Sequence, residues 1–466
     1  MLESGKADDP IWRLAQHALG SHSDSMDSNA VAVAQMIILD TVAVGIAGSA
    51  ATYADAVHGL APRWGGNGVC RVLGRGRGLP AATAAFLNAY QIHGQEFDCV
   101  HEPAVVHPMA AVMAAALAEL EQLSAGSDTT GVSGAQFLSA VSAGVDVAIA
   151  VGLSARVGLR FFRPATAGAF GAAAVAARLR GMDLATTVQV FGHLYSQLCG
   201  TMQAHSEGAA VLPMQIGFNA RNAVVAADLA SAGISAPEAV ISGPYGYLEL
   251  FEPDGDISDA LDQLDKTRRI TELSYKPFPT GRATHGGLDG ILSLRAQHGL
   301  TAAQIESVRV FGPPLIPRLV GRSVSDAMPA NTARLCMQYV GAVALVTGTV
   351  GLFDFSAKAL SDPDVMNIAQ RLTVIDDGNP DPNALLPQRV EISLFDGQSF
   401  AVDLPEVLGS PQKNLDEAAK IAKIRHCCDF AGLAPDRVQG LIDGGKTLAG
   451  LADVGDWLQY AWQPGE

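Results

Sequence analysis

The stretch HGQEFDCVHEPAVVHP, residues 93–108, gathers groups that transfer protons or bind cations. It holds three of the chain's eleven histidines, with three carboxylates among them. Imidazole titrates near neutral pH and a carboxylate can orient it, so this combination is typical of general acid–base catalysis. The candidate residues are His93, Glu96, Asp98, His101, Glu102 and His107.

His107 is followed by Pro108, a residue favoured in the first position of a helix, and then by the apolar run MAAVMAAALAEL. The spacing therefore predicts a helix from Pro108, with His107 at or just before its N-cap. The positive end of a helix dipole disfavours imidazolium and leaves His107 neutral, able to accept a proton. The same end attracts a carboxylate. The alternative is a histidine that only caps a helix.

A second candidate site is YKPFPTGRATHGGLDG, residues 275–290. Its two prolines forbid helix, so a helix is expected to begin near Gly281 and to carry His285 in its opening turns. Lys276 and Arg282 supply the fixed positive charge that an anionic substrate needs. The alternative is a solvated turn with ordinary surface charges.

Other motifs are weaker. A metal site built from residues of 93–107 is chemically possible, but the spacing matches no established ligand pattern, so no metal is predicted. GRGRG at 74–78 lacks the preceding strand and the spacing of a phosphate-binding loop. Cys99 is interpreted as a buried structural thiol rather than a nucleophile.

The elements that position these residues follow from composition. The chain has 466 residues, of which 48% are hydrophobic and 17% charged, which is enough for a large core in two or three domains. A net charge of −16 without a basic stripe excludes nucleic acid. The longest apolar stretches, near 137–155 and 339–353, are short or broken by Asp146, so we expect core helices and no membrane span. Six cysteines without a C-x-x-C pair and a polar start favour the cytoplasm.

The distribution of residue types along the chain predicts mainly α structure with a smaller α+β domain. Residues 1–270 consist of Ala-rich segments with helical spacing, such as GAFGAAAVAARLRGM, and helices so poor in charge must cover one another. An inserted α/β lid domain is expected at 271–407, and residues 408–466 return to helix and rejoin the first domain. RVEISLFDGQSFAVDL, within the lid, predicts a hairpin that turns at Asp396-Gly397.

The whole chain resembles the MmgE/PrpD family. The resemblance rests on ILDTVAVGIAGS (38–49), AAFLNAYQIHGQEFDCV and His-Pro (84–108), PATAGAFGAAAVAARLRGM (164–182) and KPFPTGRATHGGLDG (276–290), in this order. The family includes 2-methylcitrate dehydratase, cis-aconitate decarboxylase and iminodisuccinate epimerase. It implies a helical domain made from both chain ends, an α/β lid, a homodimer, and an active site between the domains without metal or organic cofactor.

Carried over by position, the resemblance implies catalytic roles for His107, His285, Glu96 and Asp98. It and the neighbouring charges imply a role in substrate binding for Lys276, Arg282, Arg163, His101, His93 and Tyr339. Three departures from the family pattern bear on the substrate. The D-F-D-D stretch has become EFDC at 96–99, Arg163 replaces a histidine in FFRPAT, and VLPMQIGFNARNAV lacks the usual lysine.

Members of this family share one chemical demand: a proton must leave or join a carbon next to a carboxylate. Two neutral histidines from opposite domains, His107 and His285, are expected to act as base and acid on a small di- or tricarboxylate. A dehydratase-like lyase ranks first, and an epimerase or a decarboxylase is the alternative. Two alternative hypotheses belong to other functional classes: a metal-dependent hydrolase, and a non-catalytic paralogue that only binds carboxylates.

Overall fold

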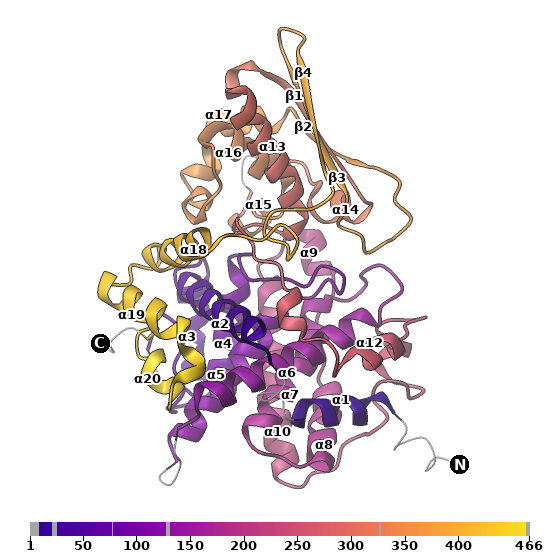
Figure 1. Cartoon of the computed structure of the whole chain (residues 1–466), viewed down its shortest axis with the longest axis vertical. Helices are drawn as coiled ribbons and strands as arrows, with labels where there is room; N and C mark the ends of the chain where they lie inside the picture. Colours follow the sequence, from indigo (N-terminus) through magenta and orange to yellow (C-terminus); the bar gives the residue numbers. More distant parts are fainter. Residues whose placement is uncertain (1–8, 21–25, 77, 127–130, 326–327, 463–466) are drawn as a thin grey trace.

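The computed structural model describes residues 9–20, 26–76, 78–126, 131–325 and 328–462. The polar start of the chain, and residue 77 of the GRGRG stretch, lie outside these ranges. The described chain is mainly helical with one small sheet, which confirms the predicted fold class. Figure 1 shows a broad helical layer that contains the N-terminal half, and a narrower unit of helices and strands above it.

The helical domain is built from both ends of the chain. Its N-terminal elements are α1 (Pro10–Leu19), α2 (Ser28–Gly48), α3 (Ala54–Trp64), α4 (Ala81–Gly94), α5 (Pro108–Ser124), α6 (Gly134–Leu153), α7 (Arg163–Leu179), α8 (Leu184–Tyr195), α9 (Gln203–Glu207), α10 (Leu212–Ser231), α11 (Tyr247–Leu250) and α12 (Ser258–Gln263). The C-terminal elements are α18 (Glu417–Phe430), α19 (Pro435–Lys446), the 3₁₀ turn η7 (Leu448–Gly450) and α20 (Val454–Leu458). The C-terminal helices α18 and α19 pack on α2, so the two ends share one core (Figure 1).

Small residues let the central helices approach one another closely. A Cβ atom added at Gly171 of α7 would overlap with the carbonyl oxygen of Gly144 of α6. Several helices also begin at the residues that helix-start rules favour: Asp27 caps α2, Ser133 forms a capping box on α6, and α5 starts at Pro108. The Ala-rich composition thus produces tightly packed helices with little polar surface.

Two helices, α2 and α6, are long and apolar enough to cross a membrane by length and composition alone. In the structure, 72% of the most apolar window of α2 and 89% of that of α6 are buried inside the protein. Both belong to the core of the helical domain. Burial to this extent is the environment that a core helix of a globular protein requires.

The smaller domain has a separate core, formed by residues between 278 and 404 with a few from the helical domain. Its helices are α13 (His285–His298), α14 (Leu315–Val320), α15 (Ala330–Ala333), α16 (Met337–Thr347) and α17 (Pro363–Ala369). Short 3₁₀ turns accompany them or precede them: η2 (Arg269–Glu272), η3 (Arg282–Thr284), η4 (Ala302–Gln304), η5 (Leu352–Phe355) and η6 (Ala359–Ser361).

The strands of the smaller domain form one four-stranded sheet in the order β2-β1-β3-β4. They are β1 (Ile305–Gly312), β2 (Leu372–Asp376), β3 (Gln388–Leu394) and β4 (Ser399–Leu404). β1 and β2 are parallel, and the other pairs are antiparallel. The predicted hairpin is confirmed as β3–β4, with Val390 opposite Val402 and with Gly397 at φ 87° in the turn.

Candidate active site

The stretch 93–108 connects α4 to α5 and folds back on itself. His93 lies in the last turn of α4, and His107 is the N-cap residue of α5, as predicted. Between them the chain forms an antiparallel bridge from His101 to Val106. This return brings the rings of His93 and His107 together, with their centroids 4.9 Å apart and their planes at 74°.

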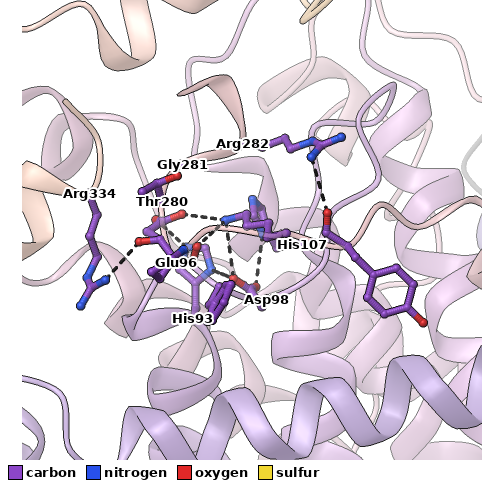
Figure 2. A network of polar contacts seen from close by, with 12 residues as sticks. His93, Glu96, Asp98, His107, Thr280, Gly281, Arg282 and Arg334 are labelled. Carbon is purple, nitrogen blue, oxygen red and sulfur yellow. Dashed lines mark hydrogen bonds and ion pairs between the residues drawn. The ribbon is translucent and has the colours of Figure 1, made fainter. Parts of the chain in front are cut away.

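Both imidazoles face one buried carboxylate, that of Asp98. His93 Nδ1 lies 3.1 and 3.0 Å from the two carboxylate oxygens of Asp98, and His107 Nδ1 lies 3.2 Å from Oδ2 (Figure 2). Lys276 Nζ is 3.9 Å from Oδ1. Asp98 is fully buried, which alone would raise its pKa, yet the two histidines hold the pKa of this carboxyl well below its usual range. We call His93, Asp98 and His107 the histidine–aspartate cluster.

The two histidines of this cluster differ in their preferred charge. Burial lowers the pKa of both, because a charged ring loses its hydration. For His93 the attraction of Asp98 and Glu96 is the stronger influence, and its pKa is raised. For His107 burial dominates over the attraction of Asp98, and Lys276 adds repulsion, so its pKa is lowered. The surroundings therefore favour the protonated form of His93 and the neutral form of His107.

Glu96 and Lys276 form a buried ion pair between the helical domain and the segment that leads into the smaller domain. Lys276 Nζ lies 3.0 Å from Glu96 Oε2 and 3.2 Å from the Glu96 carbonyl oxygen. Burial would raise the pKa of Glu96, but Lys276 and the two histidines lower it to about 2. Glu96 has a φ of 51°, in the left-handed region, which is uncommon for a residue other than glycine.

The second predicted segment, residues 275–290, contacts the stretch 93–108. Arg282 donates from Nε to Glu102 Oε1 at 2.6 Å, and from Nη1 to the Leu408 carbonyl oxygen at 2.8 Å. The expected helix start near Gly281 is a 3₁₀ turn, Arg282–Thr284, and α13 begins at His285. Arg282 thereby joins the 93–108 stretch to the start of the smaller domain.

His285 is the first residue of α13 and has the cations Arg282 and Lys276 near it, as predicted. It is fully buried, with Nδ1 3.2 Å from Arg282 Nη1 and Nε2 3.3 Å from the Thr280 carbonyl oxygen. Burial and the charges of Arg282 and Lys276 hold its pKa well below the ordinary value. A proton-transfer role for His285 stays a prediction, and its contacts fit a neutral ring that supports Arg282.

A cavity of about 70 Å³ lies between the two domains, beside the histidine–aspartate cluster. Its titratable lining residues are His93, Glu96, His107, His205 and Arg282. The other described lining residues are Val100, Val105, Leu159, Phe162, Pro164, Met202, Leu212, Gly281, Ala283, Leu319, Val320, Leu335 and Leu385. His285 is not among the described residues that line it. Leu212 lies in the stretch where the resemblance leads us to expect a lysine.

Sequence analysis did not identify His205 as a site residue. It lies in the short helix α9, and Arg322 donates to its carbonyl oxygen at 3.1 Å. Burial and Arg322 lower its pKa to about 4, so the ring is neutral near pH 7. The residues around it, MQAHSEG, match no catalytic or binding motif. The sequence therefore gave no reason to expect that this histidine lines the cavity.

Three of the predicted substrate-binding residues lie elsewhere. Arg163 is buried and paired with Glu252, with Nε 2.7 Å from Oε1. The Tyr339 hydroxyl donates to the Asp354 carbonyl oxygen at 2.7 Å inside the core of the smaller domain. His101 faces an outer cavity of about 620 Å³, where its Nε2 is 3.0 Å from Glu272. Their substrate-binding roles stay predictions without support from the cavity lining among the described residues.

The histidine–aspartate cluster also has the composition of a metal site. His93, Asp98 and His107 each offer one ligand atom, and these atoms lie within 4.8 Å of one another. Lys276 opposes a cation here, because its ammonium group lies 3.9 Å from Asp98. The Nδ1 atoms of both histidines face Asp98, so these possible donors are engaged with the carboxylate. The residues fit a proton-transfer cluster better than a metal centre.

Comparison with known protein families gives two matches, one in each of the two parts of the chain described above. The model of the MmgE/PrpD N-terminal domain matches residues 12–260, and that of the MmgE/PrpD C-terminal domain matches 278–443. The chain is 25% identical to cis-aconitate decarboxylase-like protein oryM of Aspergillus oryzae, over 91% of each chain. It is also 25% identical to the cis-aconitate decarboxylases of Aspergillus terreus (94% of this chain and 92% of the relative) and Mus musculus (90% and 86%).

Proposed function

The chain belongs to the MmgE/PrpD family, and we propose that it is a lyase that moves a proton at the carbon next to a carboxylate of a small organic acid. The observation that carries this proposal is the histidine–aspartate cluster at the cavity wall. Two titratable groups whose surroundings push their pKa values in opposite directions form a natural acid–base pair.

In this proposal His107 is the base and His93 the acid. A carboxylate only accepts hydrogen bonds, so Nδ1 of His93, which is hydrogen-bonded to Asp98, carries hydrogen. We propose the same for Nδ1 of His107, which lies 3.2 Å from Asp98 Oδ2. Nε2 of neutral His107 then has a free electron pair that can accept a proton. Its place at the N-terminus of α5 further favours this neutral form. His93 holds a proton that it can give to carbon, and Asp98 keeps both rings oriented.

Decarboxylation is the reaction that the cavity favours. In this step the bond to the carboxylate carbon breaks, carbon dioxide leaves, and the electron pair left on the substrate carbon takes a proton from His93. Neutral His107 then accepts a proton from solvent and passes it on to restore protonated His93. Solvent later returns that proton, so the reaction consumes one proton for each carbon dioxide released. Twelve of the eighteen cavity residues are apolar, and such a wall disfavours the charged carboxylate relative to neutral carbon dioxide. The names of the relatives are consistent with this choice.

The cavity is lined by residues of both domains, so a change in their separation would alter access to it. Lys276 and Arg282 reach the helical domain from the segment that begins the smaller domain. We propose that this domain acts as a lid, and that its closure excludes water and completes the site.

The test is incubation in D₂O with a panel of small carboxylates, with carbon dioxide release and carbon-bound deuterium followed by gas analysis and NMR. We expect deuterium in the product, and loss of turnover in His93→Gln and in His107→Gln. The matched control is His298→Gln, an exposed histidine of α13. Water loss without carbon dioxide would indicate a dehydratase, and exchange with inverted configuration an epimerase. Either result would replace the decarboxylase assignment.

The same assay with a chelator separates this proposal from metal-dependent hydrolysis. We expect unchanged turnover in the presence of EDTA and no metal in stoichiometric amount. Loss of activity that returns with a divalent metal would assign the cluster to a metal centre instead. Full activity in both His93→Gln and His107→Gln would remove the proton-transfer role altogether.

A further inference from the structure

A second cavity lies at the junction of the two domains, with a volume of about 240 Å³. Among the described residues it shares no lining residue with the cavity beside the histidine–aspartate cluster, which we call the catalytic cavity. The two are close neighbours. Gln95 and Arg334 line the second cavity, while the residues that follow them in the chain, Glu96 and Leu335, line the catalytic cavity. We call the second cavity the Arg334 cavity.

The lining of the Arg334 cavity combines one charge with a mostly apolar wall. Arg334 is the only charged residue among the described residues that line it. The helical domain contributes Tyr53 and Tyr90 to the wall, and the smaller domain contributes Phe355 and Leu360. A largely apolar and aromatic wall with a few fixed polar groups is typical of a site for a small organic ligand.

The side chain of Arg334 is buried without a carboxylate partner. It is 4% exposed and forms no ion pair with the described residues. Its guanidinium donates to the Gln95 side chain and, at 3.1 Å, to the Pro279 carbonyl oxygen, and it lies 4.0 Å from the ring centroid of Phe355. The two hydrogen bonds use two of the five N–H donors of a guanidinium, which leaves three without an acceptor in the described part of the chain.

The positive charge of Arg334 is only partly compensated by the protein. Burial lowers the pKa of Arg334 to about 9, because a charged guanidinium loses its hydration there. The attraction of Glu96, Tyr339 and Asp354 offsets only part of this effect. Glu96 is already paired with Lys276 at 3.0 Å. An anion that enters the cavity would supply negative charge and accept charge-assisted hydrogen bonds, which are among the strongest in proteins.

We propose that the Arg334 cavity binds a small organic acid with one carboxylate and an apolar body. The guanidinium binds the carboxylate through its remaining N–H groups, and the apolar body lies against Tyr53, Tyr90 and Phe355. Figure 2 shows Arg334 and Arg282 on opposite sides of Glu96, so this anion is held apart from Arg282 of the catalytic cavity. Because both domains line the Arg334 cavity, the bound acid contacts both and stabilises their present arrangement.

Benzoate is the probe for this site, and benzamide, which has nearly the same shape without the charge, is its matched control. Binding is measured by calorimetry and by the rise in the unfolding temperature of the whole protein. We expect benzoate to bind at least about tenfold more tightly than benzamide, a ratio typical of a hydrogen bond to a charged group. Inorganic phosphate, an anion without an apolar body, should bind more weakly than benzoate. Equal affinity for benzoate and benzamide, or tighter binding of phosphate, would overturn the proposal.

Variants locate the bound acid. Arg334→Gln should lose at least about tenfold in benzoate affinity, while Arg309→Gln, at an exposed arginine of β1, and His107→Gln, in the catalytic cavity, should keep the wild-type affinity. Ala357→Phe places a ring in the cavity from an exposed position and should block benzoate with Arg334 intact, which decides the question if Arg334→Gln does not fold. Wild-type affinity in Ala357→Phe, or loss of binding in His107→Gln, would contradict the assignment.

This proposal goes beyond the proposed function and fails separately from it. Benzoate binding is measured without turnover, so the absence of carbon dioxide release from every acid would leave the Arg334 site standing. Conversely, a protein that releases carbon dioxide but does not bind benzoate would refute the Arg334 site and leave the proposed function standing.

Discussion

At the scale of single residues, Asp98 determines how the site works. It is buried, it contacts both histidines, and its negative charge supports the protonated form of His93. A carboxylate in this position also fixes which ring nitrogen of each histidine carries hydrogen. Nε2 of His107 is then the ring nitrogen left for proton transfer, whereas Nε2 of His93 lies 3.5 Å from Glu96 Oε1.

Replacing Asp98 by Asn should therefore impair catalysis with little effect on substrate affinity. The amide has nearly the same shape but carries no charge, so the pKa of His93 falls and the acid is lost. We expect kcat to fall by about 10²–10⁴, the usual contribution of general acid–base catalysis, with KM nearly unchanged. Steady-state kinetics on the folded variant measure both. A kcat within twofold of the wild-type value would show that Asp98 has no catalytic influence.

The opposite pKa shifts predict a bell-shaped pH profile. His107 must be neutral and His93 protonated. The pKa of His107 lies below the ordinary 6.5, so activity should be lost as pH falls through that lower value. The pKa of His93 lies above 6.5, so activity should be lost again as pH rises through that higher value. The profile of kcat/KM against pH checks this, and a single limb centred at pH 6.5 would contradict it.

Sequence reasoning at this scale identified the 93–108 cluster and the N-cap position of His107, because local spacing determines both. It could not identify His93 as the partner of His107, since their contact depends on the return of the loop. Arg163 illustrates the same limit. An arginine in a predicted site segment suits a substrate carboxylate, but its actual partner, Glu252, is 89 residues away.

At the scale of elements, close helix crossings explain why the chain is so rich in Ala and Gly. α6 and α7 meet at Gly144 and Gly171, where no side chain fits. Composition predicted such crossings, although it could not tell which glycines lie in contact. The hairpin β3–β4 was predictable with its register, because Asp396-Gly397 fixes the turn.

Gly171→Val should destabilise the helical domain. Its Cβ would overlap with a backbone oxygen that cannot rotate away, and overpacking of this kind costs about 1–3 kcal/mol. Urea unfolding measures the loss. Gly59→Ala in α3 is the matched control, because no atom lies within 4 Å of its added Cβ, and it should gain up to about 1 kcal/mol. Equal stability of the two variants would contradict the close crossing.

At the scale of the whole molecule, two ion pairs join the segment before α13 to the helical domain. Lys276–Glu96 and Arg282–Glu102 both pair residues that are 180 positions apart in the chain. The distribution of residue types along the chain indicated the two domains. The contact between residues 93–108 and 276–285 could not be predicted in this way, because it is seen only in the folded chain. The cavity lies at this junction, and so the chemistry depends on both domains.

Lys276→Met should destabilise the protein strongly, since it leaves Glu96 as a buried carboxylate without its partner. Removal of one member of a buried ion pair costs about 3–5 kcal/mol. The double variant Lys276→Met with Glu96→Gln removes both charges and should recover most of this loss. Urea unfolding of the two single variants and the double variant gives the coupling. Additive losses would show that the pair does not join the domains.

The central claim is that His93 is protonated and His107 is neutral while both contact Asp98. NMR of the protein labelled with ¹⁵N-histidine at pH 7 tests it most directly, with His93→Gln and His107→Gln used to assign the ring signals. The account predicts an imidazolium spectrum for His93 and a neutral ring protonated at Nδ1 for His107. Two neutral rings, or two charged rings, would contradict it.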